Sequence, residues 1–350
     1  MRIHLSLHEF CLSPIMESAK VNSMTADYDS HSTLQLEANQ RNLQPLAAAL
    51  LACLRPNRPL ILADFGSATG LNSMKTFTQA FLTLREVSQT EVQVVHVDLP
   101  SNAWAVLFTN AATSEYSYLT LPGMYVAGVG RSNFERLFPE NHLSVGYSTF
   151  ALHWLSRRGA SKHQLRRFCE EESTCLSELH SIAMADLRAF LSYRAQELIP
   201  GGRLLIQTPV SKLELEGFYE ALKGMEASGS IGAEVLETFT IPWYLRSEED
   251  YETVVSEIPA LCVFQKTITE LIDPFYRKLQ EDQDFETYAS TVVQASRTAT
   301  EKLFSEAFNL YGERQPALLE EFYGRVREIV KAKAKPMHTK QMLLVIEKTQ

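Results

Sequence analysis

The sequence lacks the features of a nucleic-acid-binding protein. None of its runs of lysine or arginine is longer than a pair, and its 42 acidic residues outnumber its 33 basic ones, which gives a net charge of −9. Proteins that bind DNA or RNA through the phosphates need a basic patch, because each contacted phosphate is neutralised by a Lys or Arg side chain. The composition therefore argues against nucleic acid as a partner.

A disulfide framework is also absent. The five cysteines are an odd number spread over the chain, at positions 11, 53, 169, 175 and 262. Such a pattern is not typical of a secreted protein, so the sequence predicts a reducing compartment, the cytoplasm. The spacing of His163, Cys169, Cys175 and His180 matches none of the short paired spacings of structural zinc sites. We expect no zinc there.

Long apolar runs are missing as well. The first 20 residues include Arg2, Glu9 and two histidines, so they contain no continuous apolar core for a signal peptide or a membrane span. We therefore expect no membrane partner and interpret residues 1–25 as a loose N-terminal tail, with Met16 and Met24 as alternative starts. With 350 residues, 45% of them hydrophobic, the chain is long enough for a large core with an added lobe.

The most informative stretch is residues 60–84. Residues 60–63 predict a buried strand, Asp64, Gly66 and Gly70 predict a turn that can approach a bound nucleotide, and apolar residues at helical spacing follow. The dinucleotide pattern G-x-G-x-x-G is absent, which disfavours a nicotinamide-dependent oxidoreductase. Asp64 would repel a pyrophosphate but suits a cation. This favours S-adenosylmethionine, which carries an ammonium and a sulfonium group.

Further strands alternate with helices. We predict helices over residues 32–53 and 170–198, and strands over residues 92–98, 124–129, 143–150, 203–208 and 341–347. This alternation predicts an α/β fold with a mostly parallel sheet and helices on both faces. Asp98 ends the second strand, so it is expected beside Asp64 at the carboxyl edge, where ligands bind in open sheets. There it could bind the two ribose hydroxyls of a nucleoside.

Residues 211–336 have a different pattern. They read as mostly helical, with scattered aromatic side chains, and the strand at 341–347 returns to the sheet after them. We therefore expect a core formed by residues 26–210 and 337–350, with residues 211–336 inserted as a helical cap over the acceptor pocket.

Several motifs resemble those of the SABATH family, the plant-type methyltransferases named for salicylate, benzoate and theobromine enzymes. The stretches that match, in order, are Tyr28-x3-Ser32-x2-Gln35, Asp64-x-Gly66-x3-Gly70-x-Asn72-Ser73, Asp98-Leu99-Pro100-Ser101-Asn102, Ser132-x3-Arg136-Leu137-Phe138-Pro139, Phe150-Ala151-Leu152-His153-Trp154-Leu155-Ser156 and Ile241-Pro242-Trp243-Tyr244. The resemblance covers most of the chain and implies the Rossmann-like class I methyltransferase fold.

The resemblance also implies the residues that line the S-adenosylmethionine site. They are Tyr28, Ser32, Asp64, Asn72, Asp98, Leu99, Ser132 and Asn133, together with the turn glycines Gly66 and Gly70. Asn133 stands where the family usually carries a phenylalanine against the adenine. The site therefore lacks one aromatic face.

For the acceptor, the resemblance implies that Gln35 and Trp154 hold a carboxylate through two neutral donors. Phe150, His153, Trp243 and Tyr244 are the other candidates for contact with the acceptor. A carboxylic acid is already ionised near pH 7, so we predict no acid or base catalyst. Some relatives have a magnesium site that includes an asparagine near the cap motif, but residues 237–240 here contain none, and we predict no metal requirement.

The sequence thus predicts an S-adenosylmethionine-dependent O-methyltransferase that forms the methyl ester of a small carboxylic acid. Two alternatives stay open: N-methylation of a purine-like ring, and a relative that binds the cofactor without turnover. The family often forms dimers, so a homodimer is an expectation of the resemblance alone.

Overall fold

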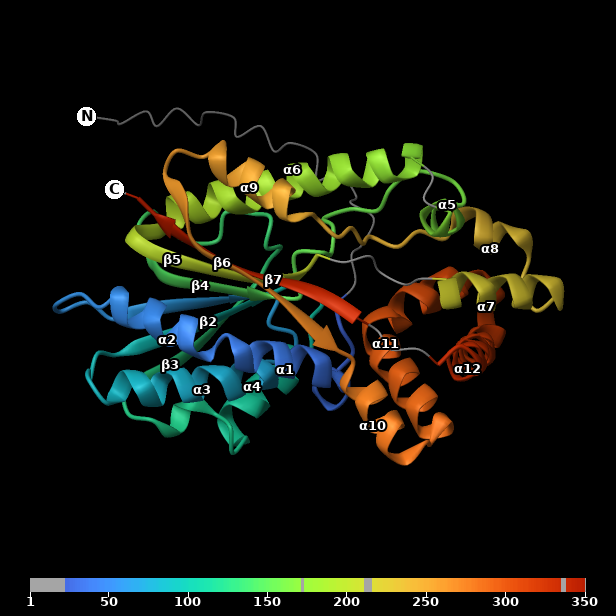
Figure 1. Ribbon diagram of the computed structural model, residues 1–350, viewed down its shortest axis with the longest axis horizontal. Coiled ribbons are helices and arrows are strands. Elements are labelled where there is room, and N and C mark those ends of the chain that lie inside the picture. The colour runs from blue at the N-terminus through green and yellow to red at the C-terminus, as the bar shows by residue number, and fades with distance from the viewer. Residues whose placement is uncertain (1–22, 171–172, 211–215, 335–337, 350) are drawn as a thin grey trace, which may run out of the picture.

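A seven-stranded sheet forms the centre of the computed structural model, which describes residues 23–170, 173–210, 216–334 and 338–349 (Figure 1). In these ranges the strand order is β3-β2-β1-β4-β5-β7-β6. Strands β1 to β5 are mutually parallel, and β7 runs antiparallel to both β5 and β6. The strands are β1 (Leu60–Phe65), β2 (Val92–Asp98), β3 (Met124–Gly130), β4 (Leu143–Thr149), β5 (Leu198–Pro209), β6 (Leu261–Ile272) and β7 (His338–Lys348).

Helices cover both faces of this sheet. One face carries α1 (Thr33–Arg41), α2 (Leu43–Ala52), α3 (Leu71–Arg85) and α4 (Trp104–Thr113), and the other carries α6 (Ser173–Glu197) and α9 (Glu248–Ser256) (Figure 1). All six residues of β1 are buried, as expected for a strand packed on both sides. The predicted apolar stripe of α3, Met74, Phe77, Phe81 and Leu84, is fully buried against the sheet.

Two predicted boundaries were wrong. The helix predicted over residues 32–53 is two helices, α1 and α2, that meet at Asn42. Pro45 lies in the first turn of α2 and has no N–H for the carbonyl of Arg41, so one continuous helix is disfavoured. Residues 200–202 do not precede the fifth strand but lie inside it, where Gly201 has a φ of +73° and the register against β4 shifts. The Pro-Gly-Gly sequence produces an irregularity and not a strand end.

The later helical predictions were largely correct. The helix predicted over residues 170–198 is confirmed as α6, and a short helix that was not predicted, α5 (Gln164–Cys169), precedes it. The segment after residue 210 contains helices, as predicted, but it also contains β6, which pairs with β7 at the sheet edge. Most of β6 is exposed, so its sequence has neither the apolar run nor the clean alternation by which strands are recognised.

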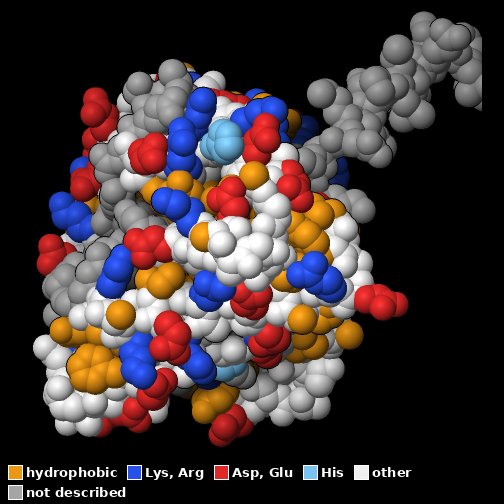
Figure 2. Space-filling view, turned by 90° about the vertical axis from the view of Figure 1, so that its right-hand side faces the viewer, with side chains coloured by type: hydrophobic (Ala, Val, Ile, Leu, Met, Phe, Trp, Pro, Cys, Tyr) orange, Lys and Arg blue, Asp and Glu red, His pale blue; other side chains and the backbone are white. Residues whose placement is uncertain are grey.

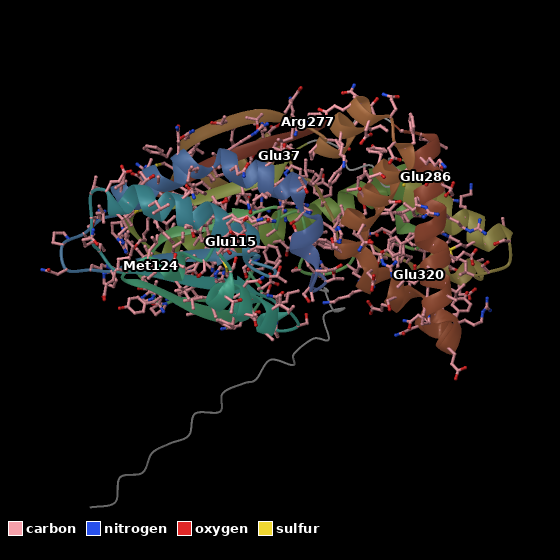
Figure 3. All side chains as sticks on the ribbon, turned by 90° about the horizontal axis from the view of Figure 1, so that it is seen from below. Glu37, Glu115, Met124, Arg277, Glu286 and Glu320 are labelled. Atoms are coloured by element: carbon pink, nitrogen blue, oxygen red, sulfur yellow. The ribbon has the colours of Figure 1, made fainter. Side chains whose placement is uncertain are left out.

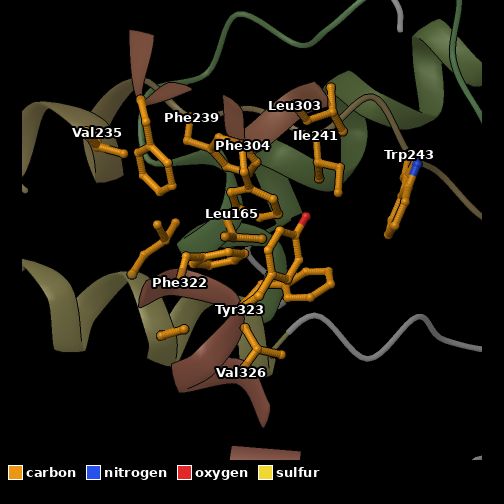
Figure 4. Close-up of a cluster of buried hydrophobic side chains, with 14 of the residues drawn as sticks. Leu165, Val235, Phe239, Ile241, Trp243, Leu303, Phe304, Phe322, Tyr323 and Val326 are labelled. Atoms are coloured by element: carbon orange, nitrogen blue, oxygen red, sulfur yellow. The ribbon is translucent and has the colours of Figure 1, made fainter. Parts of the chain in front are cut away.

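The remaining helices gather at one end of the sheet (Figure 1). They are α7 (Glu216–Ala227), α8 (Ala233–Thr238), α10 (Pro274–Asp282), α11 (Phe285–Ala307) and α12 (Gln315–Ala332). Elsewhere along the chain, short 3₁₀ helices form at η1 (Tyr28–His31), η2 (Tyr118–Thr120) and η3 (Asn309–Arg314). Phe304 belongs to the hydrophobic cluster that joins α7, α8, α11 and α12, with its ring centroid 4.0 Å from that of Phe322 and 4.6 Å from that of Phe239 (Figure 4). We call these five helices the cap.

The cap contacts the helices at the carboxyl edge of the sheet. Arg277 on α10 pairs with Glu37 on α1 at 2.6 Å, and Figure 3 shows these two side chains side by side. The backbone N–H of Thr25 donates to the carbonyl of Thr298 on α11 at 3.1 Å. Figure 2 looks onto the cap end of the molecule, where acidic and basic side chains are intermixed. Within the described ranges, no helix has both the length and the apolarity needed to cross a lipid bilayer.

The aromatic core of the cap should carry much of its stability. Phe304 is 0% exposed. The change Phe304→Ala should lower the free energy of unfolding by about 3–5 kcal/mol, because it removes buried area and leaves a cavity. Urea unfolding followed by circular dichroism measures this. Leu310→Ala, at a position 58% exposed, is the control and should cost no more than about 0.5 kcal/mol. An equal loss in both variants would contradict the assignment of this core.

Candidate active site

Two carboxylates lie on neighbouring strands near the carboxyl edge of the sheet. Asp64 near the end of β1 and Asp98 at the end of β2 are on adjacent parallel strands, as predicted. Asp98 accepts the backbone N–H of Ala68 at 2.8 Å on Oδ2 and that of Leu99 at 2.7 Å on Oδ1. Burial raises the pKa of Asp98 to about 6, with a smaller contribution from the charge of Asp64, while the two N–H groups and Lys302 oppose the rise.

The glycine turn after β1 brings this edge against the loop after β4. Gly66 has a φ of +87°, and a Cβ atom at this position would lie 2.3 Å from Cβ of Ala151. Ala68 also has a positive φ, +47°, in the conformation that directs its N–H to Asp98. A side chain at residue 66 would therefore close the space in which a ligand can approach the turn backbone.

The segment before α1 lies over the same edge. Ser32 accepts a hydrogen bond from the side-chain amide of Asn72 at 2.7 Å, and both residues are buried. Ser23 donates to the carbonyl of Ser101, just after β2, at 2.8 Å. Lys302 lies on the cap helix α11 and donates to the hydroxyl of Ser23 at 2.7 Å and to the carbonyl of Met24 at 3.0 Å. Residues 23–32 thus lie between the sheet edge and the cap.

The loop after β3 is held by an ion pair that no motif indicated. Arg194 and Glu197 on α6 are fully buried and pair with each other, and Arg194 donates to the carbonyl of Asn133 at 3.0 Å. Glu197 accepts the backbone N–H groups of Leu137 at 2.6 Å and Phe138 at 3.0 Å. The pair therefore fixes the stretch that carries Ser132, Asn133 and the Arg-Leu-Phe-Pro motif.

Asn133 offers an unsatisfied acceptor beside the glycine turn. Among the described residues, its buried Oδ1 has no hydrogen-bond partner, and its Nδ2 would lie 3.7 Å from a Cβ atom at Gly66. A buried polar atom without a partner is costly, so this position suits a ligand that carries an N–H donor. An adenine amino group has that chemistry. Together with the paired carboxylates and the glycine turn, these groups fit a cationic nucleoside such as S-adenosylmethionine.

Two loops that carry residues predicted to contact the acceptor meet near the glycine turn. The backbone N–H of Leu155 donates to the carbonyl of Pro242 at 2.8 Å, and that of Tyr244 donates to the carbonyl of His153 at 2.9 Å. The rings of Trp154 and Trp243 meet edge to face, with 4.8 Å between centroids. The structure thus brings His153, Trp154 and Trp243 together, as the sequence predicted for one site. The ring of Tyr244 instead contacts His180, at 5.6 Å.

Two buried charged residues that no motif indicated hold the loop of residues 150–156, which we call the Trp154 loop. Arg246, 1% exposed, donates to the carbonyls of Leu152 and Ala183. Asp186 on α6 accepts the backbone N–H of Ser156 at 2.8 Å and its hydroxyl at 2.6 Å. Both side chains bind backbone groups of the loop or of the helix beneath it, so they limit how far Trp154 can move.

Two polar atoms among these rings have no partner in the described structure. They are Nδ1 of His153 and the indole Nε1 of Trp243, both buried. Burial lowers the pKa of His153 to about 3, and the charge of Arg246 adds to this effect. The imidazole is therefore neutral near pH 7 and is not poised to donate a proton.

Gln35 lies on α1, and Phe150 directly precedes Ala151. Gln35 is half-buried and follows Ser32 by one turn, so the two share a face of α1. Phe150 has a φ of +51° and donates its backbone N–H to the carbonyl of Gln207 at 3.0 Å. A non-glycine residue in this conformation costs free energy and is often found where the backbone serves a site. Over the described ranges, no group of three His, Cys, Asp or Glu side chains could hold a metal ion.

Comparison with known proteins identifies the family. A family model described as SAM dependent carboxyl methyltransferase matches residues 22–349. The chain belongs to this carboxyl methyltransferase family. It is therefore an enzyme that uses S-adenosylmethionine, and the resemblance to SABATH methyltransferases is confirmed.

Individual methyltransferases are similar to this chain over most of their length. The O-methyltransferase acrG of Aspergillus aculeatus is 26% identical over 323 residues, covering 81% of this chain and 83% of that protein. The salicylate carboxymethyltransferase of Clarkia breweri is 24% identical, covering 82% of this chain and 84% of that protein. A loganic acid methyltransferase solved with SAH superposes with a TM-score of 0.77 at 20% identity, over 95% of this chain and 98% of the other. This superposition confirms the predicted fold class.

The raised pKa of Asp98 predicts a pH dependence of cofactor binding in this carboxyl methyltransferase. Each carboxylate oxygen accepts one backbone N–H and has a second lone pair for a ribose hydroxyl. The affinity for S-adenosylhomocysteine should fall as the pH decreases through about 6, because protonation removes the charged acceptor. Calorimetric titrations between pH 5 and pH 8 measure this.

Asp98→Asn tests the same assignment. It should weaken binding about 10-fold at pH 7.5, since an amide NH₂ would face one of the two backbone donors, and it should remove the step near pH 6. Protonation of Asp98 should weaken cofactor binding but raise the free energy of unfolding of the ligand-free protein. Because folding raises the pKa of this carboxyl, its charged form destabilises the ligand-free protein above pH 6. As the pH falls from 7 to 4, the free energy of unfolding of the wild type should therefore rise by on the order of 2 kcal/mol relative to that of the variant. An unchanged step near pH 6 in the variant would contradict the assignment.

Proposed function

We propose that this enzyme methylates the carboxylate of a small organic acid, and that it does so by positioning alone. S-adenosylmethionine, when bound, supplies an electrophilic methyl group on a sulfonium. The residues that would hold it are Tyr28, Ser32, Asp64, Asn72, Asp98, Leu99, Ser132 and Asn133, with Gly66 and Gly70 providing the close backbone approach. Asp64 would face the ammonium at the methionine end, and Asp98 the ribose.

The contact between the glycine turn and the Trp154 loop is the observation that supports this proposal most strongly. Gly66 and Ala151 leave no room for a side chain between them, so a nucleoside at the turn and an acceptor at Trp154 would be neighbours. Orientation of two reactants can supply roughly 7–11 kcal/mol of the barrier to a bimolecular reaction. The enzyme then has little need for other catalytic groups.

The acceptor side supports a carboxylate that stays anionic. Gln35 and Trp154 are neutral donors, and they would direct one carboxylate oxygen at the methyl group without neutralising its charge. The neutral imidazole of His153 does not supply a competing proton. We infer no general base, because the acceptor is ionised at neutral pH, and no metal requirement.

A second candidate function is N-methylation of a purine-like ring. Nδ1 of His153, which donates or accepts according to its tautomer, and the donor Nε1–H of Trp243 both lack a partner among the described residues, and the edge of such a ring offers groups for both. A hydroxylated acid would satisfy the same two atoms. The homodimer and the cytoplasmic location expected from the sequence stay predictions.

A product assay separates the candidates. The protein is incubated with methyl-labelled S-adenosylmethionine and panels of aromatic, aliphatic and terpenoid acids and of xanthines. Base-labile, volatile label identifies a methyl ester and supports the proposal. Base-stable label identifies N-methylation, and binding of cofactor without any product would mean a non-catalytic relative. Turnover that persists in excess chelator would support the absence of a metal, and its loss on chelation would contradict it.

Trp154→Phe tests the acceptor site. Loss of one hydrogen bond to a charged group should lower kcat/KM for the acceptor about 10- to 100-fold while the Kd of S-adenosylhomocysteine stays unchanged. Steady-state kinetics and calorimetry give the two quantities. Tyr125→Phe is the matched control, because it removes a polar group from an exposed aromatic on the edge strand β3. If Trp154→Phe leaves both acceptor parameters unchanged, the indole does not bind the carboxylate.

A further inference from the structure

Three buried side chains form a hydrogen-bonded chain that ends at the cofactor edge. Nδ1 of His96 lies 2.9 Å from Oδ2 of Asp64, and Nε2 of His96 lies 3.0 Å from the hydroxyl of Tyr118. Asp64 is 2% exposed, and the other two side chains are fully buried. Asp64 and His96 are register partners on β1 and β2, so the sheet itself sets their separation.

The chemistry of the three groups determines where the protons lie. An ionised carboxylate only accepts, so Nδ1 of His96 must donate to Asp64. Burial raises the pKa of Tyr118 above its ordinary value, with the charge of Asp64 adding to the effect, and the phenol keeps its proton. We assign that proton to a hydrogen bond with Nε2, 3.0 Å away, so that both ring nitrogens of His96 are engaged and the imidazole is held in one orientation.

Aromatic packing fixes the same imidazole in orientation. The rings of His96 and Tyr118 stack with 6.2 Å between centroids and an angle of 25°. Phe81 meets Tyr118 edge on at 5.7 Å, and Ser117 caps the short helix on which Tyr118 lies. His96 therefore cannot rotate away from Asp64 without disturbing two buried aromatic contacts.

The hydrogen bond from His96 orients the carboxylate of Asp64. One carboxylate oxygen is fixed by His96, and no hydrogen bond is recorded for the other within the described structure. An arginine or lysine in place of His96 would also fix the carboxylate, but it would cancel its charge. His96 orients the carboxylate through a hydrogen bond without adding a permanent positive charge beside it.

We propose that His96, held by Tyr118, is a positioning residue that presents Asp64 as an unpaired carboxylate to the ammonium group at the methionine end of the cofactor. This inference rests on the proposed assignment of Asp64 to the cofactor. It concerns binding of one part of the ligand only, and the nucleoside contacts at Asp98 are independent of it.

Two ligands that differ at the methionine end give the test. S-adenosylhomocysteine carries the amino acid end, whereas 5′-methylthioadenosine has the same nucleoside without it. Calorimetric titration of the full chain should show that His96→Leu weakens S-adenosylhomocysteine about 10-fold, the loss of an oriented charged contact, and changes 5′-methylthioadenosine less than about twofold. His96→Asn should restore most of the affinity, because its amide nitrogen occupies the place of Nδ1.

Tyr118→Phe is the second variant. It replaces His96→Leu in the test if that variant shows no cooperative thermal unfolding and is therefore not properly folded. It keeps the ring and removes only the donor to Nε2, so a smaller loss of about threefold, again confined to S-adenosylhomocysteine, is expected. The matched control is Tyr147→Phe. Tyr147 is the register partner of Asp64 on its other side, but its hydroxyl bonds to Asn42, and the ratio of the two affinities should not change.

Equal weakening of both ligands in His96→Leu, or an Asn variant no better than the Leu variant, would overturn the inference and leave a purely structural role. Those outcomes would not affect the proposed function. If the wild type bound neither ligand, the proposed cofactor site itself would be wrong, and the inference would fail with it.

Discussion

The close contact between Gly66 and Ala151 is the constraint on which the site depends. Strands β1 and β4 are parallel neighbours, so the loops that follow them leave the sheet at the same edge. Only a glycine lets these loops touch, because a Cβ atom at residue 66 would overlap Ala151. The proposed cofactor side and the proposed acceptor side of the site therefore meet where Gly66 approaches Ala151.

Buried charged side chains then hold the loops around that contact. Arg194 and Glu197 bind the backbone of residues 133–138, and Arg246 and Asp186 bind the backbone around the Trp154 loop. Burying such groups costs desolvation, and a buried ion pair is weak evidence for stability. In this enzyme they bind backbone groups of functional loops, so their contribution is better described as orientation. The hydrogen bond between His96 and Asp64 is likewise better described as orienting a side chain than as stabilising the fold.

The sequence was most informative where local pattern and chemistry coincide. The buried strand at Leu60–Phe65, its glycine turn and the amphipathic α3 were predictable because each has its own signal. Asp64 and Asp98 could be placed together because parallel strands share one carboxyl edge.

The parts that could not be predicted depend on contacts between distant residues. Arg246 reaches Leu152 across 94 positions, and His96 needed the register of β2 against β1 to become a partner of Asp64. The break at Asn42 could have been found from Pro45, but the edge strand β6 is exposed and has no pattern of its own. Motif resemblance indicated the loops that matter, but it did not indicate the charged residues that support them.

The separate hydrophobic core of the cap has a consequence for the history of this enzyme. Phe239, Phe304 and Phe322 belong to a cluster that is distinct from the two clusters on the faces of the sheet, although it also includes Trp154 as well as Leu179 on α6. Substitutions in the cap can accumulate while the nucleotide-facing edge stays intact. A lineage built this way can acquire new acceptors by repacking one lobe, which accords with a family in which one fold serves chemically diverse metabolites.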